Sequence, residues 1–503
     1  MNNKPVTEPQ KFVRGVVWVA VSQVSIVLTG LVTLPALTKC YSAETYGVWI
    51  QILVTVWLLS LVLSLHLQSA IIRFLAAEDD TEKRRRAFGA MLWPILAFTC
   101  LVLIISFLLR QNLSILLFAE PEYAYLTPLT FLWASMEALY AFSLSYPLAR
   151  GQIKRFSIFQ SGLAITKMVV IVTLAMAGYS LGWIIVCLIA GETIFVAVVF
   201  GMIVKEIGIP RPAFEGLKGY LAFSLPLLPS GILLWVIGAT DRYFITHLLN
   251  LSQTGIYSAS YAIGSLIALF YFPIYVALFP TVSRLWEQKE LSRVRSHLEY
   301  STKLFLTLAI PGAAGLYILS QPLLGILTTS DYMVGGGLIL LVALGTMLAG
   351  IYHINVFTIL LTQQTKWLPL IMAIAAITNA GINLALIPKI GIMGAAISTI
   401  VSYFILAAIV TVWASRVISY KVDIKFLAKV VAGTLLMTFC LSFIKIGGIL
   451  GIIIIAIAGV IIFALALWLL RAFSSEDRKL IKEILLSLKP GALPRDVNAK
   501  PDN

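Results

Sequence analysis

The sequence is poor in charged residues, and acidic residues are the scarcer kind. Of 503 residues only 12% are charged, with 23 Asp or Glu against 37 Lys or Arg, while 60% are hydrophobic. A soluble globular protein carries about twice that charged fraction. So much apolar side-chain area cannot be hidden in one water-soluble core, which means that much of it must face lipid. We therefore predict an integral membrane protein.

Cysteine is scarce as well, which argues against a metal centre. The four cysteines are far apart, three of them inside apolar runs, and their spacing is not that of metal ligands. We interpret them as packing residues and expect neither a metal nor another cofactor. They are Cys40, Cys100, Cys187 and Cys440.

A cleavable signal peptide is not evident at the N-terminus. Residues 1–10 are polar, and the apolar run that follows is too long and lacks a small-residue cleavage site. We interpret that run as the first membrane-spanning segment.

The chain contains about fourteen apolar runs of the length that crosses a bilayer, roughly 20 residues each. We therefore predict an all-α membrane protein with both termini in the cytoplasm, in the inner (cytoplasmic) membrane. The predicted spans are 13–37, 46–72, 87–109, 122–149, 155–177, 180–203, 217–240, 253–283, 303–327, 333–363, 365–387, 391–416, 425–444 and 447–470.

The placement of basic residues supports this count and orientation. The segments predicted to be cytoplasmic hold 31 of the 37 Lys and Arg residues, as the preference of these residues for the inner side requires. Topology and anionic lipid therefore explain the net charge of +14, which does not argue for nucleic-acid binding. The cytoplasmic segments are 1–14, 73–86, 150–155, 204–218, 284–303, 364–366, 416–429 and 471–503.

Short internal matches indicate that the first twelve spans are two parallel copies of six. Ala164-Ile165-Thr166 matches Ala376-Ile377-Thr378, Gly182 matches Gly394, and Gly47-Val48-Trp49 matches Gly255-Ile256-Tyr257. Two such bundles facing each other would enclose a cavity, as in alternating-access transporters.

The matches also suggest a division of the chain. We predict an N-terminal bundle (1–216), a C-terminal bundle (217–424) and two further helices (425–473). The last segment, 474–503, would hold an amphipathic helix on the cytoplasmic leaflet and a tail.

Three charged residues are expected near the bilayer midplane, where charge is costly and suggests function. They are Glu137, Lys167 and Glu192. One interpretation is a buried ion-pair cluster that stabilises the first bundle. The other is a cavity-lining cluster that binds a polar substrate or a coupling cation, Na⁺ or H⁺.

The second bundle offers neutral polar residues instead, and we include Asn355, Asn379 and Asn383 among the candidate cavity residues. His66 and His353 can titrate, although a lone histidine is more often hydrogen-bonded in a core.

At the cytoplasmic edge, Arg14 and Arg73 are interpreted first as membrane anchors and second as an entry point for phosphate.

Two stretches resemble the oligosaccharide (O-antigen-type) flippases of the multidrug/oligosaccharidyl-lipid/polysaccharide exporter superfamily. They are ATDRYFITHLLNLSQTGIYSASYAI, residues 239–263, and NAGINLALIPKIGIMGAAISTIVSY, residues 379–403. The resemblance implies a non-enzymatic carrier that moves a polyprenyl-pyrophosphate-linked oligosaccharide to the outer leaflet by alternating access, for surface polysaccharide biosynthesis. Its partners would be this lipid-linked oligosaccharide, membrane lipids and polysaccharide polymerase machinery.

Within this resemblance, Asp241 and Arg242 are expected at the outer end of the span 217–240, before an outside loop at 241–252. A planar guanidinium suits phosphate oxygens, so Arg242 is a candidate ligand of the pyrophosphate. Asp241 would pair with another cation, and Tyr257 would be an interfacial aromatic residue. Alternatively, Asp241 and Arg242 only anchor their helix at the interface.

The sequence also allows other functions. The chief alternative is a cation-coupled drug or metabolite extruder of the same fold, which the net negative charge of the midplane cluster would suit. A membrane-bound glycosyltransferase or polymerase is not expected, because the longest predicted outside loops, 110–121 and 241–252, offer only Glu120 and Asp241 as acids. No G-x-x-x-x-G-K-[ST] loop is present, so an ATP-powered pump is not expected either.

Overall fold

The computed structural model describes residues 8–420, 423–444 and 447–472, and side chains from residue 17 onward together with Gly15. Within these ranges all regular secondary structure is helical. Thirteen of the described helices or helix pairs are long and apolar enough to cross a membrane. The prediction of an all-α, multi-pass membrane protein is confirmed. The amphipathic helix predicted after residue 474 lies outside the described residues.

The first half of the chain forms one bundle. α1 packs along α7, and α2 packs against α6, which in turn packs on α8 and α3. Its helices are α1 (Glu8–Cys40), α2 (Ala43–Leu63), α3 (Leu67–Leu75), α4 (Thr81–Leu108), α5 (Arg110–Phe118), the 3₁₀ turn η1 (Glu122–Tyr125), α6 (Leu126–Ala149), α7 (Ile153–Met176) and α8 (Leu181–Ile207).

The second half repeats this arrangement. α18 packs on both α15 and α17, α17 packs on α10, and α13 packs on α15. Its helices are α9 (Leu217–Ser224), η2 (Leu225–Leu227), α10 (Leu228–Leu248), α11 (Leu251–Gly264), η3 (Ser265–Ile267), α12 (Ala268–Glu287), α13 (Leu291–Ile318), α14 (Ser320–Leu327), η4 (Ser330–Tyr332), α15 (Gly336–Asn355), α16 (Phe357–Leu361), η5 (Thr365–Trp367), α17 (Leu368–Ile390) and α18 (Ile392–Ile418).

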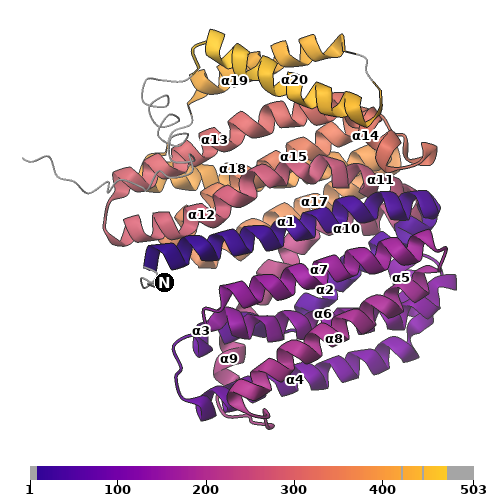
Figure 1. Cartoon of the computed structure of the whole chain (residues 1–503), viewed down its shortest axis with the longest axis vertical. Coiled ribbons are helices and arrows are strands. Elements are labelled where there is room, and N and C mark those ends of the chain that lie inside the picture. The colour runs from indigo at the N-terminus through magenta and orange to yellow at the C-terminus, as the bar shows by residue number, and fades with distance from the viewer. Residues whose placement is uncertain (1–7, 421–422, 445–446, 473–503) are drawn as a thin grey trace, which may run out of the picture.

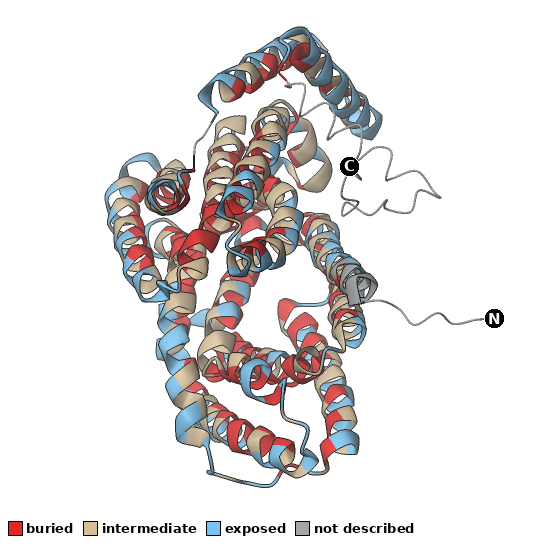
Figure 2. Cartoon of the chain, turned by 90° about the vertical axis from the view of Figure 1, so that its left-hand side faces the viewer, coloured by how far each residue is buried: buried red, intermediate tan, exposed pale blue. Residues whose placement is uncertain are grey.

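Two further helices complete the described fold. α19 (Ile424–Ser442) and α20 (Gly448–Leu469) match the predicted spans 425–444 and 447–470 closely. They pack on each other, and α19 also packs on α13. Figures 1 and 2 show them at one edge of the molecule, where much of their surface is exposed. Because the exposed side chains are mostly apolar, this surface suits lipid.

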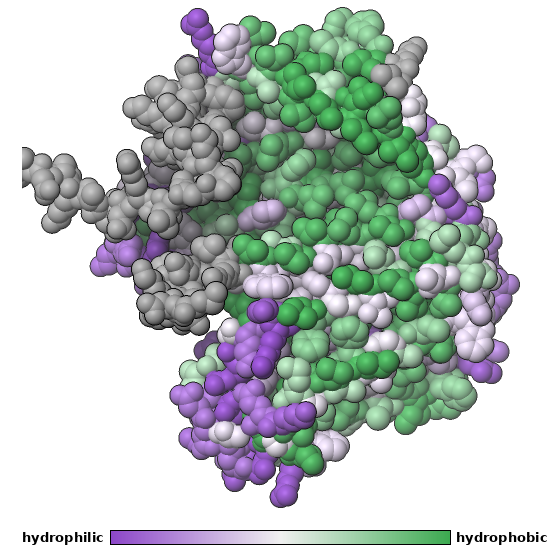
Figure 3. Space-filling model, in the orientation of Figure 1, coloured by the Kyte–Doolittle hydropathy of each residue, from purple (hydrophilic) through white to green (hydrophobic). Residues whose placement is uncertain are grey.

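The long helices run roughly side by side, so their ends define two faces. At the left in Figure 1 lie the start of α4 and the end of α8, where Arg84 forms an ion pair with Glu206 at 2.8 Å. We call this the basic face; it is the face that the sequence predicts to be cytoplasmic. Figure 3 shows hydrophilic side chains gathered on it near α3, α4 and α9, and apolar side chains across the middle of the molecule.

The two bundles meet near the opposite face, where α2 crosses α11. A Cβ atom added to Gly47 would overlap the carbonyl oxygen of Leu251, and one added to Gly255 would overlap that of Ala43. Only glycine permits this approach. Gly47 and Gly255 are equivalent positions of the predicted repeat, so the two copies touch at matching points. We call this contact the glycine crossing.

One predicted loop is wrong. Residues 241–248 do not form an outside loop, because α10 continues to Leu248 and the connection to α11 is only Leu249 and Asn250. The cause is tertiary packing: Asp241, Ile245 and Thr246 are buried in the second bundle, although charge in this stretch had suggested the end of the span. Asn250 caps α11 by accepting a hydrogen bond from the backbone N–H of Gln253 at 2.8 Å.

Candidate functional site

A cavity of about 590 Å³ lies between the two bundles, and we call it the central cavity. α1 and α2 supply one wall, and α10, α11, η3 and α12 supply the other. Along α1 it extends from Leu37, near the glycine crossing, to Ala20, toward the basic face. The two bundles therefore form a cavity between them, as the sequence predicts.

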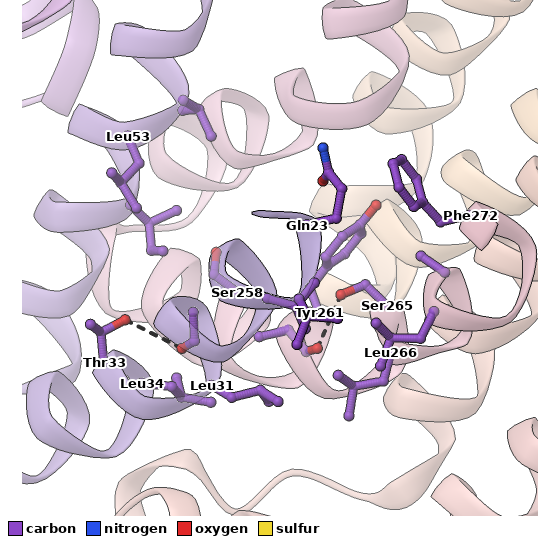
Figure 4. A pocket seen from close by; sticks show the side chains of 18 of the residues that line it. Gln23, Leu31, Thr33, Leu34, Leu53, Ser258, Tyr261, Ser265, Leu266 and Phe272 are labelled. Atoms are coloured by element: carbon purple, nitrogen blue, oxygen red, sulfur yellow. Dashed lines mark hydrogen bonds between the residues drawn. The ribbon is translucent and has the colours of Figure 1, made fainter. Parts of the chain in front are cut away.

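Most of the wall is apolar, with a small number of neutral polar and aromatic groups. Figure 4 shows Gln23 of α1 together with Tyr261 and Phe272 of the opposite wall, their side chains extending in the same direction. Such surroundings can stack on a sugar ring and exchange hydrogen bonds with its hydroxyl groups. The other polar or aromatic residues are Thr33, Tyr46, Trp49, Ser258 and Ser265.

Arg242 is the one charged side chain among the described residues that line this cavity. Its Nη1 donates to Oδ1 of Asp241 at 2.6 Å and to the carbonyl oxygen of Gly238 at 2.7 Å. The guanidinium carbon lies 4.0 Å from the ring centre of Tyr261 and 5.3 Å from that of Tyr257. The guanidinium is thus held between a carboxylate and two aromatic rings.

This geometry corrects two expectations. Asp241 pairs with the neighbouring Arg242 instead of a distant cation, and its Oδ2 accepts a hydrogen bond from the hydroxyl of Tyr257 at 2.5 Å. Tyr257 is fully buried and is not an interfacial aromatic residue. Tyr257 and Tyr261 are four residues apart, so they share one face of α11 and both reach the pair.

The three midplane charges come together in the first bundle, and we call them the triad. Nζ of Lys167 lies 2.5 Å from Oε2 of Glu137 and 3.1 Å from Oε2 of Glu192. The indole N–H of Trp133 also donates to Oε2 of Glu192, at 3.0 Å. The side chains are 33%, 20% and 0% exposed for Glu137, Lys167 and Glu192.

The triad does not line the central cavity. Glu137 and Lys167 line a separate space of about 410 Å³ between α1, α3, α6 and α7, which we call the second cavity. α1 contributes to the walls of both spaces. On the side of the second cavity, the hydroxyl of Thr29 donates to the carbonyl oxygen of Ala164 on α7 at 3.0 Å. The other polar residues that line the second cavity are Gln68, Tyr140, Ser145 and Gln160.

The asparagine candidates lie in helix contacts of the second bundle and in the lining of neither cavity. Nδ2 of Asn383 donates to Oδ1 of Asn379 at 2.9 Å, and the hydroxyl of Ser398 donates to Oδ1 of Asn383 at 2.7 Å. Asn355 is fully buried, and its Nδ2 donates to the hydroxyl of Thr411 at 3.2 Å. Their contacts join α17 to α18 and α15 to α18.

His66, Arg73 and His353 line neither cavity. His353 stacks on Tyr271 with ring centres 5.1 Å apart. His66 occupies the break between α2 and α3 with φ 56°, and its Nδ1 lies 3.0 Å from the hydroxyl oxygen of Ser69. The guanidinium of Arg73 lies 4.5 Å from the ring centre of Phe223 on α9, near the basic face. The backbone of Arg14 lies in α1, but its side chain is outside the described part of the chain.

Sequence reasoning missed residues that line the two cavities and one, Trp133, that contacts the triad. Gln160 precedes Lys167 by seven residues, which places both on one face of α7, and this spacing could have revealed it. Tyr261 stands in the quoted stretch 239–263, four residues after Tyr257, and could have been found in the same way. Trp133 gave no such signal, because tryptophan is common in membrane helices.

Comparisons with known proteins agree with this fold. A family model described as "Polysaccharide biosynthesis protein" matches residues 37–334, which is more than half of the chain. The "Probable low-salt glycan biosynthesis flippase Agl15" of Haloferax volcanii is 24% identical over 239 residues, which cover 48% of this chain and 49% of that protein. The chain thus spans about half the length of this relative.

Solved structures show the same architecture at low identity. The lipid II flippase MurJ, in an inward closed conformation, has a TM-score of 0.78 at 16% identity and covers 92% of this chain and 99% of its own. An inward-facing multidrug resistance MATE family transporter has a TM-score of 0.65 at 12% identity and covers 80% and 98%. The fold is therefore that of the superfamily that the two quoted stretches predict, and the chain belongs to the polysaccharide biosynthesis protein family.

Proposed function

We propose that this protein is a flippase that moves a polyprenyl-pyrophosphate-linked oligosaccharide from the inner to the outer leaflet, for surface polysaccharide biosynthesis. It would work in the inner membrane, with the basic face toward the cytoplasm and without catalysing a chemical reaction. The observation that carries this proposal is Arg242, a single guanidinium in the wall of an otherwise uncharged cavity between the bundles.

The cavity wall matches the head of such a substrate in chemistry. A guanidinium offers several N–H donors in one plane, and phosphate oxygens accept them two at a time. Asp241 and Gly238 both accept hydrogen bonds from Nη1 of Arg242, and Tyr261 also hydrogen-bonds to this side chain. The aromatic and neutral polar groups nearby suit sugar rings and hydroxyls.

The polyprenyl tail would remain in lipid while the head crosses. Val24 of α1 and Leu269 of α12 line the central cavity, yet both are strongly exposed on the molecule. This apolar part of the wall, between α1 and α12, is chemically suited to a hydrocarbon chain. We assign the tail to this side.

The closed glycine crossing supports alternating access. In this proposal the crossing closes the cavity toward the face predicted to be outside, and the substrate would enter from the basic face. Opening this contact would release the head on the other side. No ATP site is expected in the chain, so the driving force would be an ion gradient, the membrane potential or consumption of the product by polymerase machinery outside.

The lining of the central cavity disfavours the drug-extruder alternative. An acidic partner is the strongest stabiliser of an organic cation in a low-dielectric site, but no Asp or Glu is among the described residues that line this cavity. Of the two acids that made this alternative attractive, Glu137 lines the second cavity and Glu192 is buried behind it, and Lys167 already neutralises one of their charges.

The direct cellular test is to deplete the protein in its own host and determine on which leaflet lipid-linked glycan accumulates. We expect accumulation on the cytoplasmic leaflet and loss of surface polysaccharide, both reversed by the wild-type chain. Unchanged polysaccharide with raised sensitivity to organic cations would contradict the proposal and favour an extruder.

A further inference from the structure

The triad has an unbalanced charge. With both carboxyl groups ionised and Lys167 protonated, it carries one net negative charge in the middle of the first bundle. The elements packed around it add no charge: among the described residues, α6 contributes the neutral Tyr140, and α1 and α3 contribute the neutral Thr29 and Gln68. An uncompensated charge in a low-dielectric interior has a high free energy, and a buried carboxylate without a partner therefore tends to bind a proton and become neutral.

The hydrogen bonds show which carboxylate oxygen of the triad lacks a donor. Oε2 of Glu192 accepts from both Lys167 and Trp133, whereas the fully buried Oε1 has no donor. The carboxyl groups of Glu137 and Glu192 are nevertheless within hydrogen-bonding reach of each other. A proton bound to one of the two carboxyl groups would remove the excess charge, and on Oε1 of Glu192 it would also occupy the oxygen that has no donor.

We propose that the triad is a proton-binding site, in which one exchangeable proton is shared by Glu137 and Glu192 beside the ammonium of Lys167. Binding converts one carboxylate to a carboxylic acid, and release returns the proton to water. The site is separate from the central cavity, so it supplies a means of coupling transport to a proton gradient. In this respect the inference goes beyond the proposed function.

The second cavity gives the proton a route. Glu137 lines it and is one-third exposed, while Glu192 is sealed behind Glu137 and Lys167. The cavity continues past Ser145 to Leu148 and Phe156, at the ends of α6 and α7 that lie toward the basic face. Tyr140 Oη, Gln68 Oε1 and Gln160 Oε1 are buried without partners along this wall, and water in the cavity would bind them.

A metal cation fits this site less well than a proton. Nζ of Lys167 already occupies the position between the two carboxyl groups, at 2.5 and 3.1 Å from them. A sodium ion in the same place would be repelled by the ammonium at short range.

Infrared spectroscopy of the full chain in lipid nanodiscs tests the proposal without any glycan. Surface carboxyl groups ionise near pH 4, so a carboxylic C=O band that persists at pH 6 and disappears on strong alkalinisation reports a buried acid. We expect this band in the wild type. Glu192→Gln and Glu137→Gln each make the triad neutral and should abolish it, whereas Glu215→Gln, at an exposed glutamate, should leave it intact.

The lysine variant gives the opposite prediction. Lys167→Met leaves two carboxyl groups without a cation, so the band should grow to about twice its wild-type area, as the charge count requires. If this variant does not fold, Glu137→Gln with Lys167→Met leaves one unpaired carboxyl group and should retain a band of wild-type size.

Three results would overturn the inference: no band in the wild type, a band that survives Glu192→Gln, or a band removed at constant pH by adding NaCl but not by choline chloride. The last would identify a sodium site. Because the spectrum does not depend on transport, failure of the proton site and failure of the flippase proposal would be seen in separate experiments.

Discussion

At the scale of single residues, Arg242 is the proposed ligand of the substrate pyrophosphate. Removing it alone would leave Asp241 buried without its partner, a loss that typically costs about 3–5 kcal/mol. We therefore expect Arg242→Ala to lower the amount of folded protein as well as export. A fall in export from this variant would be ambiguous.

The double variant Asp241→Asn with Arg242→Gln separates the two effects. It is neutral and retains hydrogen-bonding groups at both positions, so abundance and melting temperature should stay near wild type. Glycan export should fall at least tenfold, because no guanidinium remains for the pyrophosphate. Export at the wild-type level, measured as surface polysaccharide per folded protein, would reduce Arg242 to a structural role.

The sequence identified these charged residues but not the space that each one faces. Glu137, Lys167 and Glu192 were expected at one depth, and they do meet. Which cavity they face depends on how α6, α7 and α8 are rotated about their axes. The sequence does not predict this rotation, because these helices are apolar and have no clear polar stripe. Arg242 was placed at the interface because charge normally ends a span. Its partners Tyr257 and Tyr261, on another helix, make burial possible.

At the scale of elements, the glycine crossing between α2 and α11 is the expected outer gate. Gly47→Ala in an ordinary helix would stabilise it by about 0.5–1 kcal/mol. Here the new methyl group would meet the backbone of α11 and force the gate apart. The test is a cysteine introduced at Ser265, in the central cavity, and labelled with a membrane-impermeant thiol reagent added outside. We expect this cysteine to react several-fold faster when Gly47→Ala is present than when Gly47 is retained.

This measurement uses a chain whose native cysteines are replaced by serine. Gly30→Ala is the matched control, because Gly30 lines the same cavity and an added Cβ would meet open space there. It should leave the labelling rate unchanged. If Gly47→Ala labels no faster than the control, the crossing is not the gate.

Most elements could be predicted because long apolar runs leave few alternatives to a spanning helix. The predicted span 122–149 corresponds to α6, which contains Glu137. By length and composition alone α6 is not among the thirteen candidate membrane spans. The break at Leu65 and His66, both with positive φ, had no glycine or proline to mark it. After the break, α3 packs on α6 and α9.

At the scale of the whole molecule, the two repeats meet at the glycine crossing and line the central cavity together, whereas among the described residues the triad and the second cavity belong to the first bundle. The asymmetry follows from the sequence: Lys167 in the first copy is matched by Asn379 in the second, where the surrounding hydrogen bonds are neutral. One bundle is therefore suited to respond to protons. Both bundles contribute to the wall that would hold the substrate head.

The central claim, that this chain moves a lipid-linked glycan across a bilayer, is tested most directly by reconstitution. Full-length protein is placed in liposomes with a polyprenyl-pyrophosphate oligosaccharide from its host, and the fraction of glycan accessible to an external lectin is followed over time. The account predicts rapid exchange between leaflets with the wild type, and near-background exchange with the Asp241→Asn, Arg242→Gln variant. Equal and slow exchange for wild type, variant and empty liposomes would contradict it.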